Sequence, residues 1–231
     1  MSRKIGIIGA MDTEIASIVK SMKIDKEEKN ASLTFYCGSF QDVPCVVAKC
    51  GPGKVNAAVC AQIMIDHYNA ELIINTGVAG GIGKNVRIGD IVIATSCVEH
   101  DMDTTALGDK LGFISGIELV EIPCSNQVSD ILYEEAQKIY GHAHKGVIAT
   151  GDIFVADSEK NRKLSEIFGA LACEMEGAAI AHVCYMNGID AAVIRAISDN
   201  ADDNGKVDFP EFTKLAAENC IKLLKHTIGK L

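Results

Sequence analysis

The sequence predicts an α/β protein built around a sheet that contains parallel strands. Short apolar runs of strand length alternate with segments of helical spacing along the 231 residues. The clearest case is a strand–helix–strand unit formed by Leu171 to Met175, Gly177 to Tyr185 and Ala191 to Ile197. We expect one domain rather than two small ones, because no linker, repeat or low-complexity segment interrupts the chain.

The other elements follow from the same patterns, in chain order. The N-terminal half predicts a buried strand at Lys4 to Ala10 and a helix at Asp12 to Met22, with Asp12 as N-cap. A hairpin follows, formed by Ser32 to Phe40 and Val43 to Cys50 with a turn near Gln41-Asp42. A second helix at Lys54 to His67 and a strand at Leu72 to Thr76, followed by the glycine-rich loop Gly77 to Gly83, complete this half. The C-terminal half predicts strands at Asp90 to Val98, Ile117 to Ile122 and Lys145 to Thr150, and helices at Gln127 to Tyr140, Ser158 to Phe168 and Asp208 to His226, the last capped by Asp208.

Composition and charge limit the kinds of molecule that the protein can bind and the compartment in which it can work. The net charge of −9 disfavours a nucleic-acid surface. No apolar run is long enough to span a membrane, and the N-terminus has no signal-peptide pattern. The nine cysteines are scattered without a CxxC pair, and most lie in apolar segments. We therefore expect buried, reduced thiols in a cytoplasmic protein that acts on a small molecule.

Charged residues gather at the ends of the strand–helix–strand unit. Glu174 and Glu176 end its first strand, Asp199 ends its second, and Arg195 lies inside the second. Ligands of parallel sheets bind outside the carboxyl ends of the strands, so Glu176 and Asp199 should share one mouth. A buried arginine is costly unless it is paired. Each acid alone could simply cap a helix or start a turn, but the group together favours a site.

Two glycine-rich loops resemble phosphate-binding motifs and fail in detail. Gly51 to Lys54 ends in Gly-Lys without the spacing of a P-loop. Gly77 to Gly81 follows a strand but leads to another strand, whereas the dinucleotide fingerprint needs a helix there. Either loop could be a plain tight turn, or could let the backbone approach a ligand closely.

Two further segments resemble metal sites. Asn200 to Glu211 matches an EF-hand loop at several positions, but Pro210 and the preceding strand argue against calcium. His100, Asp101 and Asp103 have no second histidine at ligand spacing, so a hydrogen-bonded loop is the better interpretation. We therefore expect no bound metal.

Segments spread over the whole chain carry a resemblance to a known family. They are Ile5 to Glu14 (IGIIGAMDTE), Gly51 to Ala57 (GPGKVNA), Ile73 to Gly81 (IINTGVAGG), Val86 to Val92 (VRIGDIV), His100 to Ala106 (HDMDTTA), Thr150 to Phe154 (TGDIF), Glu174 to Val183 (EMEGAAIAHV) and Arg195 to Asp199 (RAISD). With these segments the chain resembles the 5′-methylthioadenosine/S-adenosylhomocysteine nucleosidases of the nucleoside phosphorylase superfamily.

The resemblance implies a three-layer α/β/α sandwich around a mixed, partly barrel-like sheet, a homodimer, and cofactor-free hydrolysis of the bond between ribose C1′ and adenine N9. By position, Glu14 would activate water, Asp199 would protonate adenine N7, and Glu176 would hold the ribose hydroxyls. The other implied substrate-binding residues are Met175 under the sugar, Phe154 stacked on adenine, Val155 through its backbone, Ser198 and Arg195 orienting the acids, and Gly80 and Val78 beside the substrate.

The residue types suit this chemistry independently. Loss of a purine leaves an oxocarbenium-like sugar, as in glycoside cleavage, where one carboxyl acts as acid and another as base. Adenine leaves poorly as an anion, so protonation at N7 matters, and Asp199 must hold a proton at neutral pH.

The chain departs from the family pattern around the 5′ substituent. Val78 stands where a serine is usual, and Pro52 replaces an apolar residue. Leu107 and Ser115 occupy positions that usually bring an aromatic residue and a proline from the partner subunit. The preferred 5′ substituent therefore stays open.

Three alternatives remain at this point. A purine nucleoside phosphorylase on the same fold would need several arginines around phosphate, whereas the chain has only Arg3, Arg87, Arg162 and Arg195. Hydrolysis of aminofutalosine would use the same ribose and adenine contacts. A calcium-binding module would rest only on Asn200 to Glu211.

Overall fold

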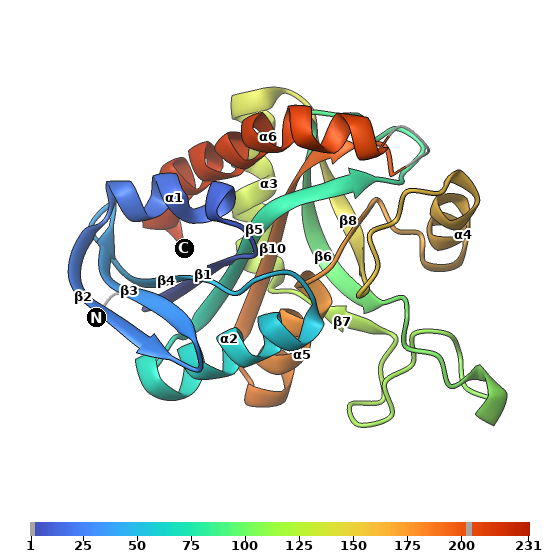
Figure 1. The fold of residues 1–231 in the computed structure, drawn as a ribbon, viewed down its shortest axis with the longest axis horizontal. Helices are drawn as coiled ribbons and strands as arrows, with labels where there is room; N and C mark the ends of the chain where they lie inside the picture. Colours follow the sequence, from blue (N-terminus) through green and yellow to red (C-terminus); the bar gives the residue numbers. More distant parts are fainter. Residues whose placement is uncertain (1–2, 202–204) are drawn as a thin grey trace.

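One mixed sheet of ten strands organises the residues that the computed structural model describes, which are 3–201 and 205–231 with the side chains of 205–211 excepted (Figure 1). The strands are β1 (Ile5–Gly9), β2 (Lys23–Asn30), β3 (Leu33–Phe40), β4 (Val43–Lys49), β5 (Leu72–Gly81), β6 (Ile91–Glu99), β7 (Glu121–Pro123), β8 (Ala143–Thr150), β9 (Ala172–Glu174) and β10 (Asp190–Asp199). The helices are α1 (Asp12–Ser21), α2 (Lys54–Tyr68), α3 (Asn126–Tyr140), α4 (Ser158–Phe168), α5 (Gly177–Asn187) and α6 (Gly205–Thr227), with short 3-10 turns at η1 (Thr105–Leu107) and η2 (Ile228–Lys230).

Half of this sheet closes on itself. β10 pairs with β6, β6 with β8, β8 with β9, β9 with β5, and β5 again with β10. These pairings form a closed five-stranded ring. From β5 the sheet continues as an open wing through β1, β4, β3 and β2. The expected mixed, partly barrel-like sheet is confirmed.

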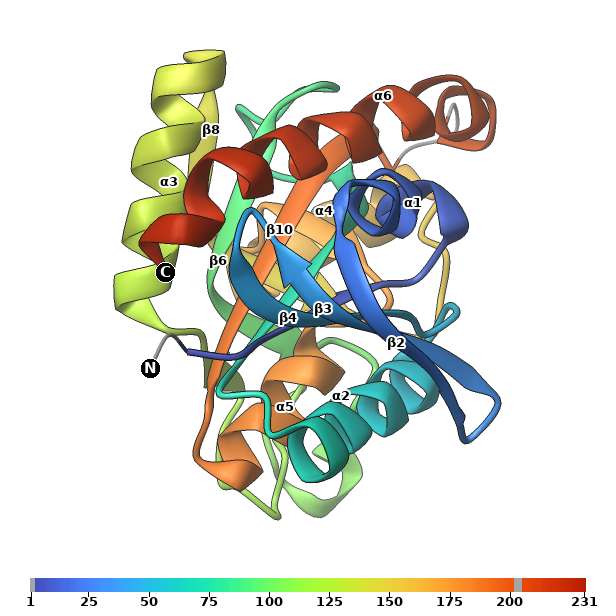
Figure 2. The same ribbon diagram turned by 90° about the vertical axis from the view of Figure 1, so that its left-hand side faces the viewer.

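Helices cover both faces of the sheet, which confirms the three-layer arrangement. Figure 2 shows α1, α3 and α6 on one face and α2 and α5 on the other. The strands between these layers are apolar on both sides: in β1, Ile5 and Ile7 pack with the α1, α3 and α6 side, and Ile8 packs with the α2 and α5 side. A strand buried on both faces reads as a continuous apolar run, and this is why β1 is recognisable from sequence.

The expected hairpin and thiols are also confirmed. Gln41 and Asp42 both adopt positive φ, at 52° and 62°, in the turn between β3 and β4. All nine cysteines are free, and all but Cys37 are buried. No helix within the described ranges is long and apolar enough to cross a membrane.

Several predicted boundaries are wrong. Met11, not Asp12, is the N-cap of α1. β5 continues through Gly81, so most of the predicted glycine-rich loop is strand, with glycines where other groups approach the backbone. The predicted strand Ile117 to Ile122 reduces to β7, because the chain turns back between Ile114 and Leu119, which form an isolated bridge.

One strand was not predicted, and one helix begins earlier than predicted. The strand β2 has no predicted counterpart, because its sequence KIDKEEKN shows no apolar alternation. The helix α6 begins at Gly205, before the predicted cap Asp208. The side chain of Asp208 and most of the calcium-like segment Asn200 to Glu211 lie outside the described residues.

Candidate active site

A cavity of about 300 Å³ opens where β1, β5, β9 and β10 end and α1 and α5 begin. It brings together most of the residues predicted as a site from distant parts of the chain. Its lining consists of Ala10, Met11, Glu14, Pro52, Val78, Ala79, Gly80, Phe154, Cys173, Glu174, Met175, Glu176, Ser198 and Asp199. Val155 lines a smaller adjoining recess together with Gly80, Phe154 and Asp199. Of the predicted residues, only Arg195 lines neither space.

Glu14 is held by backbone donors on both carboxylate oxygens. Its Oε2 accepts hydrogen bonds from Ala10 N at 2.6 Å and Met11 N at 2.9 Å, and its Oε1 accepts one from Val78 N at 3.0 Å. A Cβ at Gly77 would lie 2.5 Å from Oε1, so this strand position must be glycine for the carboxylate to fit. Burial raises the pKa of Glu14, while the Arg195 charge and these N–H donors oppose that rise. The carboxyl is therefore fixed in direction at the cavity wall.

Asp199 ends β10 next to a register shift in the pairing of β10 with β5. Such a bulge turns side chains away from the regular alternation. Ser198 Oγ donates to Asp199 Oδ2 at 2.9 Å, and Ala201 N donates to Oδ1 at 2.8 Å. The carboxyl is only 2 % exposed. The Asp199 carboxyl is therefore held by one side-chain donor and one backbone donor.

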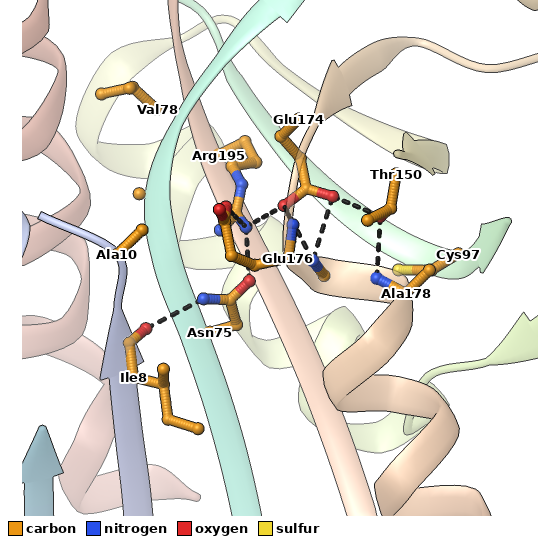
Figure 3. Close-up of polar contacts among 12 residues, drawn as sticks. Ile8, Ala10, Asn75, Val78, Cys97, Thr150, Glu174, Glu176, Ala178 and Arg195 are labelled. Carbon is orange, nitrogen blue, oxygen red and sulfur yellow. Dashed lines mark hydrogen bonds and ion pairs between the residues drawn. The ribbon is translucent and has the colours of Figure 1, made fainter. Parts of the chain in front are cut away.

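Arg195 pairs with the cavity residue Glu174 at the centre of a group of buried polar contacts, called here the floor (Figure 3). It is fully buried and forms an ion pair with Glu174 and a hydrogen bond with Asn75, while its Nη1 donates to Ile194 O at 3.0 Å. The sequence-based expectation that this arginine must be paired is confirmed. The partner, Glu174, is an acid that the sequence places at a strand end but that was not among the predicted site residues.

Glu174 is itself bound on several sides. It accepts backbone hydrogen bonds from Glu176 N at 3.0 Å and Gly177 N at 2.8 Å, and a hydrogen bond from the Thr150 hydroxyl. Its carboxylate therefore satisfies the first N–H groups of α5 while it neutralises Arg195. Asn75 completes the floor by donating to Ile8 O at 2.9 Å. The floor thus ties together β1, β5, β9, β10 and α5 (Figure 3).

Glu176 is the N-cap residue of α5 and projects into the cavity. Its Oε1 accepts a hydrogen bond from Gly53 N at 2.9 Å, and its Oε2 lies 3.8 Å from the Arg195 guanidinium. Burial, followed by the neighbouring charge of Glu174, raises the pKa of Glu176 to about 7. The glycine loop that resembles a P-loop thus presents its backbone to a protein carboxylate.

The start of α2, which supplies Gly53, is fastened by a second charged cluster. Lys54 Nζ lies 3.0 Å from Glu99 Oε2 and 2.8 Å from Asp101 Oδ1. His182 Nδ1 lies 3.1 Å from Glu99 Oε1. Asp101 is therefore part of a hydrogen-bonded loop, as expected, and the described residues contain no group of ligands suited to a metal ion. Sequence reasoning missed this cluster because its members come from unrelated segments.

The residues expected from a partner subunit lie away from the cavity. Leu107, in η1, is 82 % exposed, and Ser115 is also exposed. Neither lines the cavity within this chain.

Glu176 is expected to make the free energy of unfolding fall as the pH rises from about 4.5 to about 7. Because the folded-state pKa is raised, the stabilisation is complete below the ordinary value of 4.5 and is lost as the pH passes through about 7. A shift of this size corresponds to roughly 3 kcal/mol at most. Urea unfolding of wild type and Glu176→Gln at both ends of this window measures it, and the variant should depend less on pH. Equal pH dependence of the two proteins would contradict the assignment.

Comparison with known proteins shows the family to which this chain belongs. The family model described as the phosphorylase superfamily matches residues 4–229. The 5′-methylthioadenosine/S-adenosylhomocysteine nucleosidase of Shewanella halifaxensis is 40% identical over 210 residues, covering 90% of this chain and 91% of the relative. The aminodeoxyfutalosine nucleosidase of Campylobacter jejuni is 36% identical over 224 residues, covering 95% and 97%.

Solved structures agree with these relatives. The S-adenosylhomocysteine nucleosidase of Streptococcus pyogenes, in complex with 5-methylthiotubericidin, superposes with a TM-score of 0.95 at 35% identity, covering 100% of this chain and 98% of that one. The chain therefore belongs to the phosphorylase superfamily, among the methylthioadenosine/S-adenosylhomocysteine nucleosidases, and is a hydrolase of N-glycosidic bonds.

Proposed function

We propose that this enzyme hydrolyses 5′-methylthioadenosine and S-adenosylhomocysteine to adenine and the 5′-thio-ribose product. The observation that carries the proposal is one cavity lined by the buried carboxyl groups of Glu14, Glu176 and Asp199, beside a fourth, Glu174, that pairs with Arg195. The names of the relatives support the choice of substrates.

In the proposed reaction Asp199 gives a proton to adenine N7 as the bond between C1′ and N9 breaks. Adenine then leaves as a neutral base, and the sugar takes on oxocarbenium character. Glu14 accepts a proton from the water whose oxygen bonds to C1′. The contacts of Asp199 with Ser198 and Ala201, and of Glu14 with its backbone donors, hold both groups before the substrate arrives.

The remaining residues suit binding of the nucleoside. Glu176 can accept hydrogen bonds from the ribose hydroxyls, with Met175 beside it under the sugar. Phe154, which is 47 % exposed, offers a ring face to adenine, next to the Val155 backbone and Gly80. Val78 contributes its N–H to Glu14 and an apolar wall to the sugar site. Arg195 acts through Glu174 and Glu176.

Hydrolysis is favoured over phosphorolysis by the charges of the cavity. No lysine or arginine lines it within the described part of the chain, and Arg195 already pairs with Glu174. A phosphate dianion would meet carboxylates instead of cations. Water, by contrast, needs a carboxylate base.

Aminodeoxyfutalosine is a second candidate substrate. The observation in its favour is the Campylobacter jejuni relative, which carries that name. Its adenine and ribose halves would use the same contacts, so the two candidates differ only at the 5′ substituent.

The test is adenine release from methylthioadenosine in buffer with and without phosphate. We expect equal rates in both, with free reducing sugar as the second product. A turnover that requires phosphate and yields 5-methylthioribose 1-phosphate would make the enzyme a phosphorylase. An authentic purine nucleoside phosphorylase with its own substrate serves as the positive control for phosphate dependence.

The proposal treats the chain as one domain that works as a cytoplasmic homodimer. The family model spans residues 4–229, and the free thiols suit a reducing compartment. The exposed Leu107 and Ser115 segments are available to a second copy. Light scattering of the active enzyme should give twice the chain mass of 24.6 kDa, and an active species of 24.6 kDa would contradict the dimer.

A further inference from the structure

A second cavity, of about 330 Å³, is lined in part by chain neighbours of residues that line the candidate active site. Its walls include Asp12, Lys49 and Gly51. Asp12 directly follows Met11 and Gly51 directly precedes Pro52, and both Met11 and Pro52 line the active-site cavity. The segments Met11–Asp12 and Gly51–Pro52 therefore each contribute one residue to the active-site cavity and one to the second cavity.

The order of residues along the active site sets the direction of a bound nucleoside. Asp199, Gly80 and Phe154 line both the main cavity and the recess of Val155, so the adenine of the proposed substrates lies at that end. In a nucleoside the base is attached to C1′ and the C5′ group to C4′, the two ring carbons on either side of the ring oxygen. The 5′ substituent therefore extends away from the adenine end of the cavity, and Met11 and Pro52 are among the walls beyond that end.

The second cavity carries one positive and one negative group side by side. Lys49 Nζ and Asp12 Oδ2 are 2.8 Å apart, and their side chains are 44% and 81% exposed. Water screens such an exposed ion pair, so it gains little from its own contact and can open around a ligand. An ammonium beside a carboxylate complements the α-carboxylate and α-ammonium of an amino acid. Ser32, Thr34 and Tyr36 add hydroxyl groups to the same walls.

We propose that Lys49 and Asp12 form a subsite for a zwitterionic amino-acid group at the end of the 5′ substituent. Lys49 binds the α-carboxylate and Asp12 binds the α-ammonium. This inference rests on the proposed function and deepens it. In S-adenosylhomocysteine two methylene groups separate the sulfur from the α-carbon, so the charged end extends past Met11 and Pro52. The methyl group of methylthioadenosine ends before them.

The test compares three substrates that differ only beyond the sulfur: methylthioadenosine, S-adenosylhomocysteine and 5′-butylthioadenosine, whose tail is long but uncharged. Lys49→Met and Asp12→Asn are each expected to lower kcat/KM for S-adenosylhomocysteine about fivefold to tenfold, through KM. Turnover of the two uncharged substrates should change less than twofold. Lys163→Met is the matched control, since it removes an exposed ion pair with Glu159 on α4, away from both cavities.

The possible outcomes distinguish failure of the subsite from failure of the proposed function. A wild type that releases adenine from none of the three substrates overturns the proposed function and the subsite together. A wild type that is active, with variants that treat all three substrates alike, overturns the subsite alone. The subsite is supported if kcat/KM falls selectively for S-adenosylhomocysteine in both the Lys49→Met and Asp12→Asn variants and does not fall in the Lys163→Met control.

Discussion

Replacing Asp199 with asparagine is expected to lower turnover about 10²–10⁴-fold, or roughly 3–5 kcal/mol of barrier. Asparagine keeps the shape of the side chain and can still accept the hydrogen bond of Ser198, but it has no transferable proton. Substrate binding should weaken less, because the amide can donate to N7. Single-turnover kinetics with methylthioadenosine separate the two effects.

A 7-deaza analogue provides the decisive comparison. It has carbon in place of N7, so the wild type should barely cleave it. If Asp199 acts through N7 alone, the variant on the analogue should lose little more than either change alone, because groups that act as a unit are not additive. Losses that multiply would show that Asp199 has another role, and the acid assignment would fail.

Replacing Arg195 with methionine is expected to cost about 3–5 kcal/mol of unfolding free energy, because it leaves the buried Glu174 without its counter-charge. The Glu174 side chain is only 2% exposed, so water cannot take the place of the guanidinium. The Arg195 charge also lowers the pKa of Glu14 and of Glu176, so their pKa values should rise in the variant. Urea unfolding followed by circular dichroism measures the loss.

Two controls identify the origin of that loss. Arg162→Met removes an exposed ion pair with Glu166 and should cost less than about 1 kcal/mol. The double replacement of Arg195 and Glu174 by methionine should recover part of the stability, because the buried Glu174 carboxylate is no longer left without its counter-charge. The recovery should be incomplete, because the N–H groups of Glu176 and Gly177 lose the acceptor that Glu174 provides. A double variant no more stable than Arg195→Met would mean that size and shape, rather than charge, make this position essential.

Arg195 also illustrates what sequence alone can predict. A charge inside an apolar run requires a partner, and the acids at neighbouring strand ends are the available ones, so the site could be placed at one mouth of the sheet. The choice among those acids could not be made. Glu174 and Glu176 are separated by one residue and both line the cavity, and only the start of α5 decides that Glu174 pairs with Arg195 while Glu176 accepts from Gly53.

Other features depend on contacts between distant segments and leave no local pattern. The Gly53 N–H that meets Glu176, and the cluster of Lys54 with Glu99, arise only when α2 docks against α5 and β6. The closure of the ring is also invisible locally, since β5 and β10 are separated by the whole middle of the chain. In contrast, β1 and α5 are correctly predicted in place, because burial alone sets their composition.

The two ends of the sheet differ in how readily they could pair with a strand of another molecule and so cause aggregation. β5 and β10 pair with each other and close the ring, so neither strand is an open edge of the sheet there. The wing ends at β2, whose outer backbone is open to such pairing, and six of its eight residues, KIDKEEKN, are charged. Charges of both signs on an edge discourage stacking of one molecule on another. The polar character that hides β2 from sequence patterns therefore also protects the sheet from aggregation.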